Sequence, residues 1–200
     1  MRIPFLAKSL TLLCLALPAT AQKVQVYGGN DGRAATTQVL FGDGVMAGMS
    51  ITYGQPQWQA NYDGMLDKLK GKLLRLGKDW WTTFTTSADV EIGGVKVPAG
   101  AYLLGLSCDK DGKFALAVLD AAKALKAAAT PWPIDDAGNM NWKPDMLIPL
   151  TLNQGTAKES AEKLTMTLQA NGDDLAKGTF TLAWGKHTLT APLAVLVAKK

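Results

Sequence analysis

The segment DVEIGGVKVPAGAYLLGL, residues 89–106, decides the fold class of this chain. Apolar and charged residues alternate on both sides of Gly93 and Gly94, and a glycine pair favours the positive backbone angles of a two-residue hairpin turn. The segment therefore predicts a β-hairpin. Pro98 has no N–H for a strand ladder and ends the second strand, and a further alternating run begins at Tyr102.

The same alternation of apolar and polar side chains recurs along the chain. It is found in residues 45–53, 114–118, 164–170, 180–184 and 189–193. A period of two residues is typical of strands that bury one face. Because the residues from Asn171 to Asp174 tolerate positive φ, the runs on either side of them predict a second hairpin.

Two segments have a helical pattern instead. Residues 65–76 place apolar side chains four residues apart, and residues 120–129 are rich in alanine, so each predicts a helix. Residues 130–146 contain too much Pro, Asn, Asp and Gly for regular structure and predict a long surface loop. Many short strands without a βαβ rhythm predict an all-β fold, a mostly antiparallel β-sandwich with one or two short helices.

The first residues have the order of a secretory signal peptide. Arg2 and Lys8 come before an apolar run that is too short to span a bilayer. Small residues at positions 19 and 21 then form a cleavage motif. We expect cleavage after Ala21 and export to the periplasm or the extracellular medium. Lipidation of Cys14 is disfavoured because Leu13 stands where the processing site needs a small side chain.

Cleavage leaves a chain of the length of one domain. We expect residues 22–34 to be a flexible lead-in and residues 35–198 to form a single β-sandwich domain. The sequence has 21 basic and 17 acidic residues, and the loss of Arg2 and Lys8 leaves 19 basic residues, so nucleic acid is not an expected partner. No later segment has the roughly 20 apolar residues that a membrane-spanning helix needs.

Cysteine and histidine are scarce. Cys108, the one cysteine left after cleavage, continues the apolar register of a strand, which favours an inert core thiol over a catalytic one. His187 is the single histidine, so a zinc site of the usual kind is disfavoured. Asp109 and Asp111 lack further oxygen ligands nearby in the sequence and indicate a hairpin turn rather than a calcium loop. We expect no metal or other cofactor.

A basic cluster accompanies the first predicted helix. It consists of Lys68, Lys70, Lys72, Arg75 and Lys78. The two interpretations are contact with an anionic membrane surface and an ordinary solvated face of a packed helix. The nearly balanced charge of the mature chain favours the solvated face.

The predicted surface loop is the best candidate for a binding site. Flat apolar rings occur there beside amide and carboxylate groups, a combination that suits a sugar or another polar ring. The candidate ligand-binding residues are Trp132, Asp135, Asp136, Asn141 and Trp142, with Trp80 and Trp81 from an earlier segment. The competing interpretation is that the rings seal the edge of the sandwich, because tryptophan is highly buried on average.

Three blocks of the sequence resemble a known family. They are ITYGQPQW at 51–58, LGKDWWTTFTTSADVEIGGVKVPAGAYLL at 76–104 and GTFTLAWGKHTLTAPL at 178–193. They are similar to bacterial domain-of-unknown-function family 2911, over roughly residues 33–194. The resemblance implies an exported β-rich protein and implies no reaction. In the middle block, Trp81 stands where members commonly have arginine, and a Gly-Ala-Asn-Glu portion is missing, so a family site there would be lost or rebuilt.

These observations favour an exported, non-catalytic binding or envelope-associated module for a carbohydrate or another small polar ligand. A hydrolase that uses Asp135 and Asp136 is the alternative, and a purely structural envelope protein is a third. The hydrolase requires one of these carboxylates to meet another polar group, such as Asp79, Asn141 or Lys143, in a concave pocket. A binding module requires a groove lined by tryptophan rings instead.

Overall fold

A computed structural model describes residues 32–42, 45–62, 64–154 and 157–196. Its strands are β1 (Arg33–Gly42), β2 (Val45–Gly54), β3 (Lys72–Arg75), β4 (Thr82–Thr86), β5 (Val90–Ile92), β6 (Val95–Val97), β7 (Gly100–Cys108), β8 (Phe114–Asp120), β9 (Met146–Asn153), β10 (Ala161–Ala170), β11 (Lys177–Gly185) and β12 (His187–Val195). The helical elements are the 3₁₀ helices η1 (Ala60–Tyr62) and η2 (Leu66–Leu69) and the α-helix α1 (Ala121–Lys126). The predicted all-β class with short helices is confirmed.

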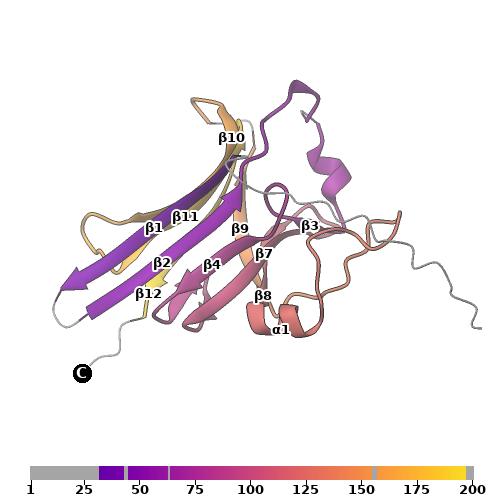
Figure 1. Ribbon diagram of the computed structural model, residues 1–200. Coiled ribbons are helices and arrows are strands. Elements are labelled where there is room, and N and C mark those ends of the chain that lie inside the picture. The colour runs from indigo at the N-terminus through magenta and orange to yellow at the C-terminus, as the bar shows by residue number, and fades with distance from the viewer. Residues whose placement is uncertain (1–31, 43–44, 63, 155–156, 197–200) are drawn as a thin grey trace, which may run out of the picture.

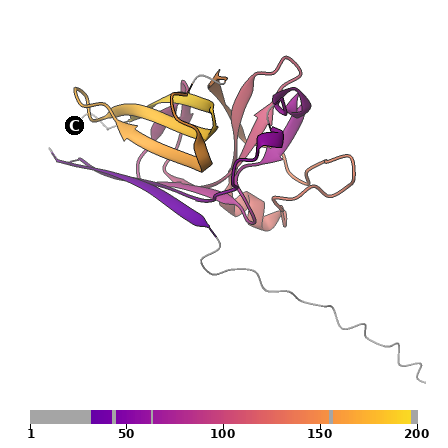
Figure 2. The same ribbon diagram turned by 90° about the horizontal axis from the view of Figure 1, so that it is seen from above.

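The strands form one antiparallel sheet that curls on itself. Its order is β1-β2-β4-β7-β8-β9-β12-β11-β10, with β3 on β7 and the β5–β6 hairpin on β12. β9 joins the two halves because it pairs with β8 on one side and with β12 on the other. Figures 1 and 2 show the two halves facing each other across a shared interior. The two layers of the predicted sandwich are therefore two halves of one continuous sheet.

The backbone that follows β2 covers the outer edge of β10 and nearly closes the sheet into a barrel. Trp58 N donates to Glu162 O at 2.6 Å, and Leu164 N donates to Pro56 O at 3.0 Å. An uncovered strand edge is prone to pair with other chains, so these bonds protect β10. They also fix the position of Trp58 relative to the second half of the sheet.

The main core fills the space between the two halves. Its most deeply buried side chains include Met49, Ile51, Val90, Val97, Leu104, Ile148, Met166 and Phe180. The hairpin predicted from residues 89–97 is confirmed, since β5 pairs with β6 and both Gly93 and Gly94 have positive φ, 56° and 80°. The second predicted hairpin is confirmed as β10 and β11.

A smaller core cluster lies on the outer face of β8. It consists of Trp81, Ala117, Leu119, Ala124 and Trp142. Helix α1 supplies Ala124, and its N-cap is Asp120, whose side chain accepts a hydrogen bond from Lys123 N at 2.9 Å. This cap satisfies a backbone donor that has no partner within the helix. The predicted helix at 120–129 is thus confirmed over its first part.

The predicted helix over residues 65–76 is wrong. Residues 66–69 form the short 3₁₀ helix η2, Gly71 has a φ of 74°, and residues 72–75 form β3, which pairs with β7. A left-handed residue interrupts a helix, and pairing with an existing sheet outweighs a weak helical preference. The basic residues of this stretch therefore do not share the face of one helix.

Several predictions fall outside the described residues. These are the signal peptide, its cleavage site and residues 22–31 of the expected lead-in, whereas Arg33 and Ala34 belong to β1. Within the described ranges, no helix combines the length and the apolar character needed to cross a membrane. Export and the domain boundaries stay predictions.

Candidate functional site

A cavity of about 500 Å³ lies where β3, η2 and the loop between α1 and β9 come together. Figures 1 and 2 show these three segments at the same end of the molecule. The volume is within the range of roughly 300–1,000 Å³ that is typical of small-molecule pockets. Apolar side chains from both halves of the sheet line its inner part: Leu106, Phe114, Leu152, Leu164, Leu182 and Leu189.

One wall of the cavity is aromatic. We call Trp58, Tyr62, Trp184 and His187 the aromatic wall. Trp58 packs edge-to-face against Trp184, with 5.1 Å between the ring centroids, and against Tyr62 at 5.6 Å, and its ring lies 5.5 Å from that of His187. Trp184 Nε1 donates to Pro56 O at 3.0 Å. The rings are therefore held by each other and by the backbone that closes the sheet.

Gly185 provides the space that Trp58 needs. This glycine has a φ of 60°, and a Cβ at its position would lie 2.6 Å from the Trp58 ring. Such a distance is well below van der Waals contact, so a side chain at this position would displace the ring. Gly185, the last residue of β11, therefore helps to shape the aromatic wall.

Another part of the lining is the edge of β3. Every residue from Lys72 to Gly77 lines the cavity. Because side chains of a strand alternate between two faces, an uninterrupted run of lining residues indicates that the cavity borders the strand's edge. Among the described strands, β3 pairs with β7 alone, so its other edge is left for the cavity.

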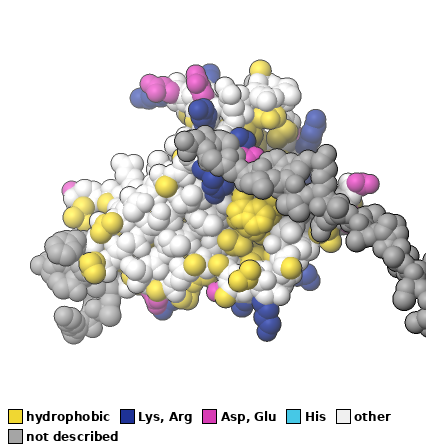
Figure 3. Space-filling view, in the orientation of Figure 1, with side chains coloured by type: hydrophobic (Ala, Val, Ile, Leu, Met, Phe, Trp, Pro, Cys, Tyr) yellow, Lys and Arg dark blue, Asp and Glu magenta, His cyan; other side chains and the backbone are white. Residues whose placement is uncertain are grey.

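Two consecutive tryptophans attach the loop between α1 and β9 to the turn that follows β3. Trp81 packs against Trp142 with 5.2 Å between the ring centroids, and Trp80 packs against Trp132 at 5.3 Å. The guanidinium carbon of Arg75 lies 5.9 Å from the centroid of Trp132, a cation–π contact. Figure 3 shows hydrophobic side chains reaching the surface over β3 and β7, beside lysine or arginine side chains.

The four tryptophans of the predicted site lie at different depths. Trp81 and Trp142 are 3% and 6% exposed and belong to the smaller core cluster, whereas Trp80 and Trp132 are 52% and 43% exposed. Of these rings, Trp132 lines the cavity. A Cβ on Gly105 would lie 2.7 Å from the Trp142 ring, so that ring is fitted closely onto β7. Trp81 and Trp142 therefore pack the loop onto the sheet.

Two polar residues of the predicted site, Asp135 and Asn141, bond within their own loop. Asp135 accepts hydrogen bonds from Asn139 N at 3.0 Å and from Asn139 Nδ2 at 2.7 Å, and these bonds hold the pKa of its carboxyl below the usual value. Asn141 bonds through its side chain to the backbone just after α1, at 3.0 and 3.1 Å. Asp136 is exposed, and none of these three residues is among those that line the cavity.

The cavity has a basic border. Among the described residues that line it, Lys72 and Arg75 are cationic and none is Asp or Glu. Over the same part of the chain, no group of three His, Cys, Asp or Glu side chains is placed to hold a metal ion. Cys108 is a buried free thiol in the main core, as predicted, and burial raises its pKa.

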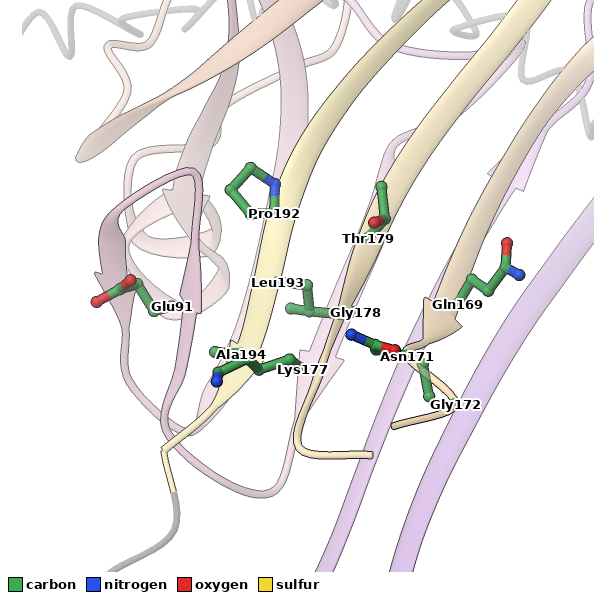
Figure 4. A pocket seen from close by; sticks show the side chains of 11 residues that line it. Glu91, Gln169, Asn171, Gly172, Lys177, Gly178, Thr179, Pro192, Leu193 and Ala194 are labelled. Carbon is green, nitrogen blue, oxygen red and sulfur yellow. The ribbon is translucent and has the colours of Figure 1, made fainter. Parts of the chain in front are cut away.

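A second concavity, of about 660 Å³, lies on the outer face of β10, β11 and β12 beside β5. Figure 4 shows Gln169, Thr179 and Pro192 next to one another across the three strands. These side chains are exposed, and the charged residues of the lining are Glu91 and Lys177. This surface has no aromatic ring among its lining residues, so the cavity beside β3 has more of the features of a ligand site.

Sequence reasoning did not bring the residues of the aromatic wall together. Trp58 lies in the first of the three family-like blocks, and Trp184 and His187 lie in the third. These aromatic residues fall in two of the family-like blocks, but nothing in the sequence shows that the two blocks meet. The basic residues Lys72 and Arg75 were visible in the sequence, but a helical interpretation gives them the wrong surroundings.

A family model described as "Protein of unknown function (DUF2911)" matches residues 37–193. The match spans all three sequence blocks and confirms the resemblance they show. No curated protein and no solved structure matches the chain.

Proposed function

The chain belongs to the DUF2911 family, and we propose that it is an exported, non-catalytic binding protein that holds a small, largely apolar ligand in the cavity beside β3. The composition of the cavity lining carries this proposal. Aliphatic and aromatic side chains from both halves of the sheet make up most of it. Moving apolar ligand surface from water into such a cavity is favourable by about 25 cal/mol per Å² buried.

The lining favours a more apolar ligand than the carbohydrate suggested by the sequence. The side chains of Asp135 and Asn141 are engaged within the loop, and Asp135, Asp136 and Asn141 are not lining residues. A sugar stacked on Trp80 and Trp132 is the second candidate, because both rings are exposed and lie side by side.

The hydrolase alternative gains no support from the geometry. General acid and base catalysis needs two groups that converge on one reacting bond. Asp135 bonds to Asn139 in its own turn, and neither it nor Asp136 reaches the cavity lining. We therefore favour binding over catalysis.

A fluorescent apolar probe tests the proposal. N-phenylnaphthylamine should show saturable enhancement with the purified protein, and dodecanol should displace it. Met140→Trp fills the cavity from the half-buried side of the loop, and we expect it to weaken probe binding about tenfold or more, a loss of about 1.4 kcal/mol. Ile134→Trp is the matched control, because Ile134 is on the same loop, 61% exposed and not part of the lining.

Two outcomes would redirect the proposal. If the wild-type protein shows no saturable probe binding, the cavity is not a site for apolar ligands. If glycans shift the tryptophan fluorescence and Trp80→Ala abolishes that shift, the exposed pair Trp80 and Trp132 is the site instead.

Export is supported by the basic, apolar and small-residue order of residues 1–21. The mass of protein recovered from the periplasm or the medium of its host should correspond to a chain that begins at Gln22. Recovery of the full-length chain from the cytoplasm alone would contradict export.

A further inference from the structure

We propose that the ligand is an anionic amphiphile with a single alkyl chain, with its carboxylate or phosphate head at Arg75 and Lys72 and its chain in the cavity. This inference rests on the proposed function. Its first support is charge complementarity, because the lining residues within the described chain include these two cations and no carboxylate. An anionic head group would be attracted to this border, and a cationic one repelled.

The carboxylates nearest to β3 in the sequence already have cationic partners. Asp67 lies 2.8 Å from Lys70, and Asp79 lies 3.3 Å from Lys78. Each pair is close to neutral as a unit. These acids therefore do not cancel the positive charge at the border of the cavity.

Arg75 is positioned in advance for an anion. It is half-buried, its guanidinium lies over the Trp132 ring, and its Nη1 donates to Asp79 O at 3.3 Å. A guanidinium has five N–H donors in a planar fork, and a carboxylate or phosphate can accept two of them at once. The ring and the carbonyl restrict its motion, so less freedom is lost when a head group binds.

The apolar side chains that make up the rest of the lining favour a ligand with an apolar portion. A fully polar ligand would leave the aromatic wall and the leucine side chains of the inner cavity facing water, whereas a fully apolar one would leave Arg75 and Lys72 unused. An amphiphile satisfies both regions. The volume of about 500 Å³ lies in the lower half of the usual range for small-molecule pockets, which favours one chain over two.

Three ligands with the same dodecyl chain test the head group. Dodecanoate, dodecanol and dodecylammonium are compared by displacement of N-phenylnaphthylamine at low ionic strength and below their micelle concentrations. We expect dodecanoate to bind about tenfold more tightly than dodecanol, as a charge-assisted hydrogen bond implies, and dodecylammonium to bind most weakly.

Charge-removing variants locate the head group. Lys72→Gln and Arg75→Gln should each reduce the preference for dodecanoate over dodecanol several-fold. Lys96→Gln is the matched control, because Lys96 is exposed on the β5–β6 hairpin and is not a lining residue. Since Arg75 also contacts Trp132, the exposed Lys72 gives the variant with the least structural effect.

The outcomes separate this inference from the proposed function. Equal binding of dodecanoate and dodecanol, or tighter binding of dodecylammonium, overturns the anionic head group and leaves the apolar cavity site in place. A dodecanoate preference that survives in both Lys72→Gln and Arg75→Gln also overturns it. Failure of all three ligands to displace a bound probe, or of the probe to bind, counts against the proposed function itself.

Discussion

The hydroxyl oxygen of Tyr53 in β2 accepts a hydrogen bond from the backbone N–H of Met166 in β10 at 2.9 Å. Both residues are buried in the main core. The bond crosses the place where the two ends of the curled sheet approach each other, next to the backbone pairing of Pro56 with Leu164. The Tyr53 side chain thus adds to the backbone bonds that close the sheet. The cavity depends on this closure because Trp58, one of its lining residues, lies in the segment that makes these backbone bonds.

Tyr53→Phe should lower the free energy of unfolding by about 1–3 kcal/mol, because it leaves the buried Met166 N–H without its acceptor. Urea denaturation measures the change. Ser50→Ala is the control, since the bond from Thr37 Oγ1 to Ser50 Oγ is exposed and its loss should change stability by less than about 0.5 kcal/mol. Equal effects of the two variants would contradict a structural role for the phenol.

The two hairpins and the strands with clear alternation could be predicted from the sequence because their signals are local, whereas β1, β4 and β9 were not predicted. The turn at Gly93 and Gly94 needs positive φ at two neighbouring residues, and the alternation around it is visible within a few positions. Strand β3 could not be predicted in the same way. Its four residues, Lys72–Arg75, are extended because they pair with β7, and that pairing is a tertiary contact.

Trp142 and Trp132 lie ten positions apart in one loop and should respond differently to truncation. Trp142→Ala should lower the free energy of unfolding by about 3–5 kcal/mol, because it empties the centre of the smaller core cluster. Trp132→Ala should cost much less stability, because the ring is 43% exposed, but it should weaken binding of the cavity probe. Urea denaturation and probe titration on the same two proteins separate these effects.

The reverse pattern would change the interpretation of the loop. If Trp132→Ala unfolded the protein and Trp142→Ala affected only binding, the ring packed against Trp81 would be the ligand contact. The exposed pair of Trp80 and Trp132 would then be structural.

The buried thiol of Cys108 should make the free energy of unfolding fall at alkaline pH. Burial raises the pKa of this thiol above that of the unfolded chain, which is about 8.5. The native state then keeps its proton where the unfolded state releases it, so the free energy of unfolding falls as the pH rises above about 8.5. Cys108→Ala should show a smaller decline over the same pH range in urea denaturation, while other titrating groups affect both proteins alike.

Thiol labelling provides an independent measurement for Cys108. Cys108 is buried in the main core and its Sγ donates to Asp109 O at 3.7 Å, so a disulfide reagent should react slowly with this thiol in the native state and quickly in urea. Rapid labelling in the native state would show that the thiol is accessible, and the expected pH dependence would then lose its cause.

The candidate site was harder to predict than the fold because its walls come from distant parts of the chain. Trp132 was predicted as a binding residue and Arg75 as part of a solvated basic cluster, and their contact is tertiary. Trp58 meets Trp184 only because the backbone after β2 pairs with the edge of β10. The cavity at the junction of these segments is formed by the way the sheet closes, and the alternation of residues along single strands does not predict it.

Alanine substitutions at Gly185 and Gly94 can separate the effect of displacing the Trp58 ring from the effect of backbone strain. Both have positive φ, 60° and 80°, so an alanine at either position should cost about 1 kcal/mol of stability. A new Cβ at Gly185 would lie 2.6 Å from the Trp58 ring. A new Cβ at Gly94 would have no other group within 4 Å. Gly185→Ala should therefore weaken probe binding, and Gly94→Ala should leave it unchanged. Equal probe affinity in the two variants, at similar stability, would mean that the position of Trp58 does not shape the ligand site.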